Sequence, residues 1–137
     1  LSYSASGDLV TALGRKALSD PDARVRGAAL QIMADIANNH RDVTLDLVPV
    51  LPRLDDPSSG VRGKAMGLLV PLAEKPLCRK AMLAAAPRLA ALLRVEQPES
   101  RDLSFTLLGL LSRKNWDRSD FIAWDAWASK AAAGEVD

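Results

Sequence analysis

Apolar residues recur along the chain at the three- and four-residue spacing that is typical of amphipathic helices. In one stretch, a common helical face carries Val25, Ala29, Ile32, Met33 and Ile36. A second stretch repeats this spacing with Val61, Ala65, Leu68, Leu69 and Leu72. Alanine and leucine dominate, and valine and isoleucine occur singly rather than in alternating runs, which favours helix over strand. The pattern therefore predicts an all-α protein.

Residues that start and stop helices divide this pattern into segments. Asp20 should act as an N-cap with Pro21 at the first helical position, and Asp56-Pro57 repeats that signal. Asn38-Asn39 should end the first of these helices. Ser119-Asp120 should cap the last. The pattern predicts about seven helices, at residues 8–18, 21–38, 41–54, 57–74, 77–95, 98–113 and 121–132.

Prolines lie inside two of the predicted helices. Pro49 and Pro52 should bend the segment 41–54 or leave a backbone carbonyl without its partner, and Pro87 lies within 77–95. The apolar residues of 41–54 that should point inward are Val43, Leu47, Val50, Leu51 and Leu54.

A repeat relates two of the predicted helices, because residues 18–29 return as residues 54–65 at an offset of 36. The identical positions in the first copy include Asp20, Pro21, Val25, Arg26, Gly27 and Ala29. A third copy begins near Gln97 and keeps the hydrophobic rhythm, but Ser104 replaces the arginine. A single helix pair cannot bury both of its apolar faces, whereas stacked pairs can. We therefore expect one domain over residues 1–137, with units at 8–38, 41–74 and 77–114 and a C-terminal capping helix at 119–132.

These segments resemble the HEAT-repeat family. The resemblance rests first on Leu47-Val48-Pro49-Val50-Leu51, Asp56-Pro57, Val61-Arg62 and Ala65. The earlier copy matches with Asp20-Pro21, Val25-Arg26 and Ala28-Ala29, and the first-helix part returns as Ala86-Pro87-Arg88-Leu89. The resemblance covers about residues 8 to 113. It implies a right-handed α-α superhelix, an armadillo-like solenoid of three to four antiparallel pairs, whose second helices line a concave side. It also implies a non-catalytic scaffold for protein–protein interaction.

Composition narrows the function classes further. The 137 residues carry a formal net charge of +1, with both signs scattered and no basic block of the kind that marks a nucleic-acid tail. The single cysteine, Cys78, excludes an internal disulfide and fits a reducing compartment, so we expect a cytoplasmic protein. Apolar runs are too short for a membrane span. Patterns for catalysis, zinc or phosphate loops are absent from the sequence, so we expect no enzyme activity, no metal and no cofactor.

Two sets of polar residues stand out. Asp20, Arg26, Asp56 and Arg62 form the repeat's polar ladder, in which an arginine can bond the aspartate of a neighbouring unit and the turn carbonyls; a ligand-binding role for these arginines is the alternative. The other set should project from the concave side toward a partner. Its members are Arg24, Gln31, Asp35, Lys64, Ser104 and Arg113.

Most of the aromatic mass lies near the C-terminus. Phe121, Trp124 and Trp127 share a helical face, and together with Trp116 they form either a cap on the last helix pair or an exposed anchor for a partner. His40 is expected in a surface turn. Arg79 and Lys80 could lower the pKa of Cys78.

Glycines lie inside the second helices of the repeat. Gly27, Gly63 and Gly67 are interpreted as points of close helix approach, or alternatively as the floor of a shallow groove.

Three functions compete at this stage. A protein-binding scaffold is favoured over nucleic-acid binding of the DNA-glycosylase-like kind, for which Arg24, Arg26, Lys64, Arg113 and Lys114 would supply the cations. A modification enzyme similar to the bilin lyases, which also use HEAT-like units, is the third alternative. Fold alone does not separate these functions.

Overall fold

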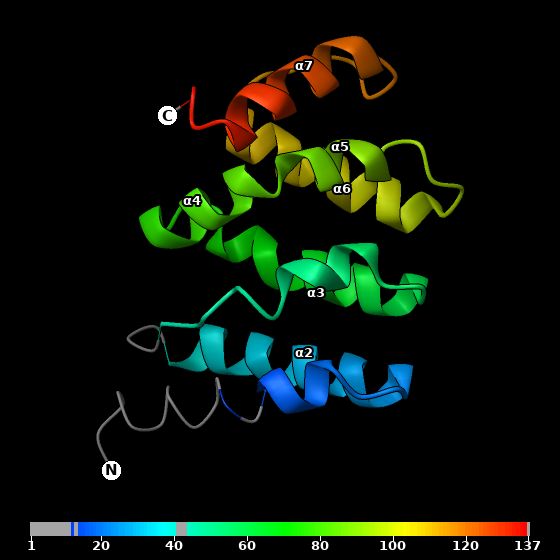
Figure 1. Cartoon of the computed structure of the whole chain (residues 1–137), viewed down its shortest axis with the longest axis vertical. Coiled ribbons are helices and arrows are strands. Elements are labelled where there is room, and N and C mark those ends of the chain that lie inside the picture. Colours follow the sequence, from blue (N-terminus) through cyan, green and yellow to red (C-terminus); the bar gives the residue numbers. More distant parts are fainter. Residues whose placement is uncertain (1–11, 13, 41–43, 137) are drawn as a thin grey trace. The chain divides into compact units, whose positions relative to one another are not determined.

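The computed structural model describes residue 12, residues 14–40 and residues 44–136 (Figure 1). Residues 14–18 are helical. The elements that follow are α2 (Ala23–Asn39), η1 (Leu51–Asp55), α3 (Ser59–Leu72), α4 (Pro76–Ala84), α5 (Ala86–Leu92), α6 (Pro98–Ser112) and α7 (Phe121–Ala132). The described residues contain no strand, so the prediction of an all-α protein is confirmed for them.

The chain divides into two compact units, unit 1 (Leu1–Leu68) and unit 2 (Leu69–Asp137), with the boundary inside α3. Unit 1 has its own core, built from Leu18, Leu30, Met33, Leu47, Val50, Leu54, Val61, Ala65 and Met66. In unit 2, α5 packs against α6 and α7, and α4 also contacts these three helices (Figure 1). Their shared core contains Met82, Leu89, Leu107, Leu108, Leu111 and Trp124.

The repeated Asp-Pro signals lie just before the helices rather than at their N-caps. Asp20 Oδ1 accepts a hydrogen bond from the Asp22 amide at 2.8 Å, and Asp22 is the N-cap of α2, accepting from the Arg24 amide. Asp56 Oδ1 likewise accepts from the Ser58 amide at 2.9 Å. The predicted N-cap at Asp20 is therefore wrong by two residues, because its carboxylate forms a turn with the residue two positions on.

The predicted helix over 41–54 is wrong. Residues 44–47 have no regular structure, and only the short 3₁₀ helix η1 follows, with Pro52 in its first turn. Pro49 and Pro52 each lack an amide donor, so an α-helix through this segment would lose hydrogen bonds at both positions. Leu47 and Leu54 are nevertheless buried as expected, and Val43 lies outside the described residues.

The predicted single helix over 77–95 is two helices. The helix is interrupted at Ala85. Pro87 lies in the first turn of α5, where the missing amide hydrogen breaks no helical hydrogen bond. By contrast α6 and α7 match their predicted bounds closely. Asp120 is the N-cap of α7, as expected, and accepts from the Ala123 amide at 3.2 Å.

Each of the two strong repeat copies forms a helix, but aligned residues of the two helices are not equally buried. Val25 is 39% exposed whereas its counterpart Val61 is 3% exposed, and Ile32 is 58% exposed against 1% for Leu68. The expected equivalence of Val25 and Val61 is therefore wrong. The buried face of α2 keeps the predicted Ala29 and Met33 but excludes Val25 and Ile32. Its buried residues are Arg26, Gly27, Ala29, Leu30, Met33 and Ala37.

Candidate binding cleft

The polar ladder is a buried ionic cluster in unit 1. Arg26 donates from Nε and Nη2 to the two carboxylate oxygens of Asp56, at 2.8 and 2.9 Å. Its Nη1 donates to the backbone oxygens of Asp20 and Pro21, both at 2.9 Å. The sequence predicted this kind of contact, in which the arginine of one repeat copy bonds the aspartate of the other copy and the backbone carbonyls of a turn. The guanidinium is thereby fully engaged, which favours the structural role over ligand binding.

Asp56 accepts further hydrogen bonds from two other arginines. Arg53 Nη1 lies 2.9 Å from Asp56 Oδ2, and Arg62 Nη1 donates to the Asp56 backbone oxygen at 2.8 Å. Burial raises the pKa of Asp56, but the hydrogen bonds from Arg26 and the Ser58 amide, together with the charges of Arg26 and Arg53, outweigh it. The net result is a lowered pKa, so Asp56 is a carboxylate at neutral pH.

The predicted partner residues of unit 1 lie on the surface and are partly used locally. Arg24 is exposed and pairs with Asp22 at 2.9 Å, and Gln31 donates to Asp35 at 3.2 Å. Lys64 is also exposed, and its side chain lies 3.5 Å from the position that a Cβ on Gly27 would take. A Cβ at Gly27 would make only an ordinary van der Waals contact there, so the close helix approach predicted for Gly27 is not seen. The same prediction for Gly67 is wrong, because nothing lies within 4 Å of its Cβ position.

Ser104 is not a surface residue. It is fully buried on α6, and its hydroxyl donates to the backbone oxygen of Leu89. The expectation that Ser104 faces a partner is therefore wrong. The aligned arginine of the first copy, Arg26, is buried as well, so this repeat position faces inward in both copies; here the Ser104 hydroxyl joins α6 to α5 within unit 2.

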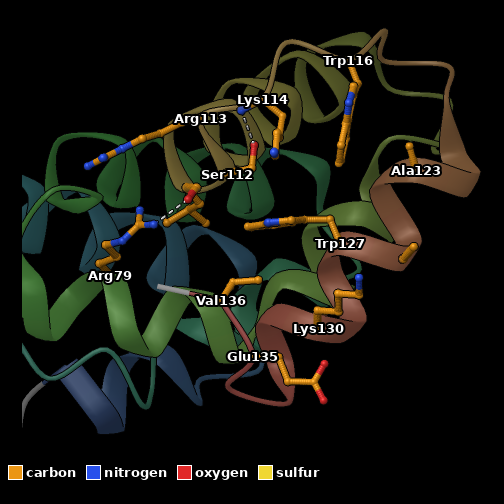
Figure 2. A pocket seen from close by; sticks show the side chains of 12 residues that line it. Arg79, Ser112, Arg113, Lys114, Trp116, Ala123, Trp127, Lys130, Glu135 and Val136 are labelled. Atoms are coloured by element: carbon orange, nitrogen blue, oxygen red, sulfur yellow. Dashed lines mark hydrogen bonds between the residues drawn. The ribbon is translucent and has the colours of Figure 1, made fainter.

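The remaining candidate, Arg113, borders an open cleft in unit 2 with a volume of 820 Å³ (Figure 2). This size lies within the range of ligand-binding pockets. The lining residues come from α4, from the end of α6 and the loop after it, from α7, and from the segment after α7. They are Arg79, Leu111, Ser112, Arg113, Lys114, Trp116, Ala123, Ala126, Trp127, Lys130, Glu135 and Val136.

Two helix ends build the borders of the cleft. Arg113 ends α6 in the left-handed conformation, with φ +59°, and its amide donates to the Gly109 oxygen at 2.8 Å. Gly134, with φ +76°, ends α7 in a Schellman motif, in which the Glu135 amide donates to the Lys130 oxygen. These turns redirect the chain, so that Lys114 follows one helix end and Val136 follows the other.

Aromatic rings support the cleft from within. Trp124 is completely buried, and its indole nitrogen donates to the Asp117 oxygen at 3.0 Å. Trp116 and Trp127 pack edge-on against it, with ring centroids at 5.1 and 6.4 Å. In Figure 2 the Trp127 side chain reaches into the middle of the cleft, between Lys114 and Val136. Trp124 and Trp127 therefore belong to the core of unit 2, whereas half-buried Phe121 stacks against Arg94 at 4.4 Å.

In unit 2, ion pairs lie outside the cleft, whereas most charged residues that line the cleft are cations. Outside the cleft, Arg94 pairs with Asp125 at 2.6 Å and Arg118 with Asp102 at 2.5 Å. Among the described residues, Arg113, Lys114 and Lys130 form no ion pair. Glu135 is the single acidic lining residue, and its carboxylate points away from the middle of the cleft (Figure 2). The cleft is therefore positively charged.

Arg79 has a structural duty as well. Its Nη2 donates to the Leu111 backbone oxygen at 2.7 Å, across from α4 to the end of α6 (Figure 2). Carbonyls at a helix C-terminus lack intrahelical partners and carry partial negative charge, so a guanidinium is favourable there. Arg79 thus fixes the wall of the cleft.

Other chemistry-bearing residues lie outside the cleft. Burial raises the pKa of the Cys78 thiol and the charge of Lys75 offsets only part of this, so the predicted lowering by its basic neighbours is wrong. His40 is exposed directly after α2, as expected. The described residues contain no cluster of His, Cys, Asp or Glu that could hold a metal ion. Every helix within the described ranges is too short or too polar to cross a bilayer.

Comparisons of the chain with protein families, with curated proteins and with solved structures found no match.

Sequence reasoning found part of this cleft. It singled out Arg113, Trp116 and Trp127, and it noted Lys114 as a cation for the nucleic-acid alternative. It missed Arg79, Lys130 and Val136. Lys130 follows Trp127 by three residues on α7, a spacing that places them on neighbouring positions of one face and was the available signal.

Proposed function

We propose that the protein is a non-catalytic scaffold that binds a protein partner, and that the cleft of unit 2 is its principal binding surface. The observation that carries the proposal is the group of unpaired cations, Arg113, Lys114 and Lys130, around a partly apolar cleft of 820 Å³. Binding surfaces combine an apolar centre with charged groups that select the partner.

The surface of unit 1 is a second candidate within this proposal. Arg24, Gln31, Asp35 and Lys64 are all exposed, but Arg24 already pairs with Asp22 and Gln31 with Asp35. A partner would have to compete with these local contacts. The cleft cations have no such competitor among the described residues, which favours the cleft.

The HEAT-like solenoid and the cytoplasmic location belong to the proposal as well. The repeat at an offset of 36 residues and the contact of Arg26 with Asp56 support a stack of related helix pairs. The unequal burial of Val25 and Val61 argues against full equivalence of the copies. A single buried cysteine, Cys78, is consistent with a reducing compartment.

Affinity capture and crosslinking with the 137-residue chain test the proposal. We expect a protein in stoichiometric amount, lost when Arg113, Lys114 and Lys130 are all replaced by glutamate. The pair Arg24→Glu and Lys64→Glu tests the surface of unit 1 in the same way. Equal recovery by the unaltered chain and by both charge-reversed variants would reject both surfaces.

Nucleic-acid binding is the alternative, because the same cations and half-buried Trp116 could meet a phosphate backbone and a base. Against it, the net charge of the whole chain is only +1. A gel shift at low salt, with single- and double-stranded DNA and RNA, decides: retardation lost in the cleft variant would favour this alternative.

A further inference from the structure

The cleft of unit 2 presents two chemistries together. Leu111, Ala123, Ala126 and Val136 contribute apolar lining, while Arg113, Lys114 and Lys130 contribute positive charge. Ile122, which is 87% exposed, precedes the lining residue Ala126 by one helical turn on α7 but does not itself line the cleft. A ligand that fills this cleft must therefore carry both negative charge and apolar surface.

We infer that the cleft recognises an acidic protein segment in which carboxylates flank an apolar side chain. The inference rests on the proposed function and specifies the partner for that same site. The apolar side chain lies against Ala126 and Val136, and the carboxylates meet Arg113, Lys114 and Lys130.

The positive charge of the cleft exceeds what the fold itself requires. A helix C-terminus carries about half a negative charge. The ends of α6 and α7 together therefore offset about one cation, and Glu135 offsets about one more. Apart from Arg79, which donates to the Leu111 oxygen, the lining holds three cationic side chains, Arg113, Lys114 and Lys130. About one positive charge remains for a ligand.

The aromatic residues favour a peptide over a nucleic acid. Base stacking requires an accessible ring face. Trp127 exposes only 7% of its surface and Trp124 exposes none, since their rings pack on one another. Trp116 is half-buried, with Lys114 Nζ 5.7 Å from its ring centroid. The cleft thus offers apolar edges to a side chain rather than a row of platforms to successive bases.

The backbone at Arg113 adds an independent argument. A left-handed residue at a helix end is usually glycine, because any Cβ there is strained. Among the described residues, Arg113 is the only non-glycine residue with positive φ. An arginine at this position costs stability, and it places a guanidinium on the Arg79 side of the cleft, pointing away from Trp127 (Figure 2). Strain of this kind is typical of positions that serve binding.

A labelled synthetic peptide in which pairs of glutamates alternate with single leucines tests the inference. Its binding to the 137-residue chain is measured by fluorescence anisotropy at low and at physiological salt. The matched control peptide carries glutamine in place of every glutamate. We expect the acidic peptide to bind at least about tenfold more tightly, because each exposed ion pair contributes up to about fivefold and several act together. Added salt should reduce this difference.

Variants assign the binding to the cleft. Replacing Arg113 by glycine and both Lys114 and Lys130 by glutamine should weaken the acidic peptide by about tenfold or more. Lys80→Gln removes an exposed cation of the same unit that does not line the cleft, and should change affinity by less than about twofold. Circular dichroism and thermal unfolding verify that each variant is folded.

Four results would overturn the inference. Equal binding of the glutamine peptide would show that charge is not read, and equal weakening by Lys80→Gln would show that the cleft is not the site. Tighter, cleft-dependent binding of a single-stranded oligonucleotide would assign the site to nucleic acid. If no acidic peptide binds but the partner captured by the chain is still lost in the cleft variant, the segment class is wrong and the proposed function stands. Failure of both experiments rejects the proposed function as well.

Discussion

Asp56 is the residue on which the ionic cluster of unit 1 depends. Its side chain is inaccessible to solvent and meets Arg26 through two hydrogen bonds, with Arg53 as a further partner. Removing one member of a buried ion pair leaves the other charge without compensation, which costs more than the pair itself contributes.

Replacement of Asp56 by asparagine should lower the free energy of unfolding by about 3–5 kcal/mol, because the Arg26 guanidinium stays buried without its counter-charge. Urea unfolding measures the change. The double variant Arg26→Met, Asp56→Asn should be less destabilised than the sum of its single variants, since the unpaired cation is gone. Additive losses, or a loss below about 1 kcal/mol for Asp56→Asn, would contradict a structural role of this pair.

Arg113 illustrates a position where stability and binding conflict. Arg113→Gly should leave the free energy of unfolding unchanged or raise it by up to about 1 kcal/mol, because glycine adopts φ +59° without strain. The gain is limited by the greater freedom of glycine in the unfolded chain. Thermal unfolding measures it. Lys80→Gly, inside α4, is the control and should lose about 1 kcal/mol. A destabilised Arg113→Gly variant would mean that the side chain holds the helix end.

At the scale of elements, the helices differ in how well their sequences fit them. α3 contains Gly67 in its interior, which weakens a helix by about 0.5–1 kcal/mol relative to alanine. The glycine has no packing reason to be there, because the space around its Cβ position is open. Gly134 differs, since its φ of +76° is unfavourable for any side chain.

Gly67→Ala should therefore raise the free energy of unfolding by about 0.5–1 kcal/mol, as measured by urea titration. Gly134→Ala should lower it by about 1 kcal/mol, because the Schellman motif after α7 needs the left-handed residue. The reverse order of the two variants would indicate that a partner or a further segment fills the space beside Gly67.

Propensity predicted the helices of this chain, but prolines decided their extent. The periodicity of 98–113 and 121–132 was sufficient, since no proline interrupts these segments after the first turn. Over 41–54 the same apolar spacing does not give an α-helix, because two prolines remove amide donors. The apolar pattern alone did not show which of these effects would prevail.

At the scale of the whole molecule, several aspartates share one pH dependence. Arg15 lowers the pKa of Asp46, Arg94 lowers that of Asp125, and hydrogen bonds with Arg24 and Ser119 lower those of Asp22 and Asp117. Asp56 is lowered as well, for the reasons given above. A carboxyl with a lowered native pKa binds fewer protons when folded than when unfolded, so its contribution is present above its ordinary pKa.

The free energy of unfolding should therefore be constant near neutral pH and should decrease as the pH falls below the ordinary aspartate value of 3.8. Urea unfolding at a series of pH values measures this dependence. Asp56→Asn should show a shallower decrease, because one of the titrating groups is absent. A decrease that begins well above this value would indicate that other groups control acid unfolding.

The sequence by itself determined the helical class and the positions of most buried apolar residues, and it indicated that a repeat's arginine can bond the aspartate of a neighbouring unit. These features follow from the spacing of apolar residues and from the repeated motif, and both can be recognised in a single sequence. Only the tertiary structure decided that Ser104 faces inward and that Val25 stays exposed where Val61 is buried. It also brought α4, the end of α6 and the segment after α7 together at one cleft. The physical reason is that burial and charge balance depend on which elements pack together, and one helix's spacing contains no information about its neighbours.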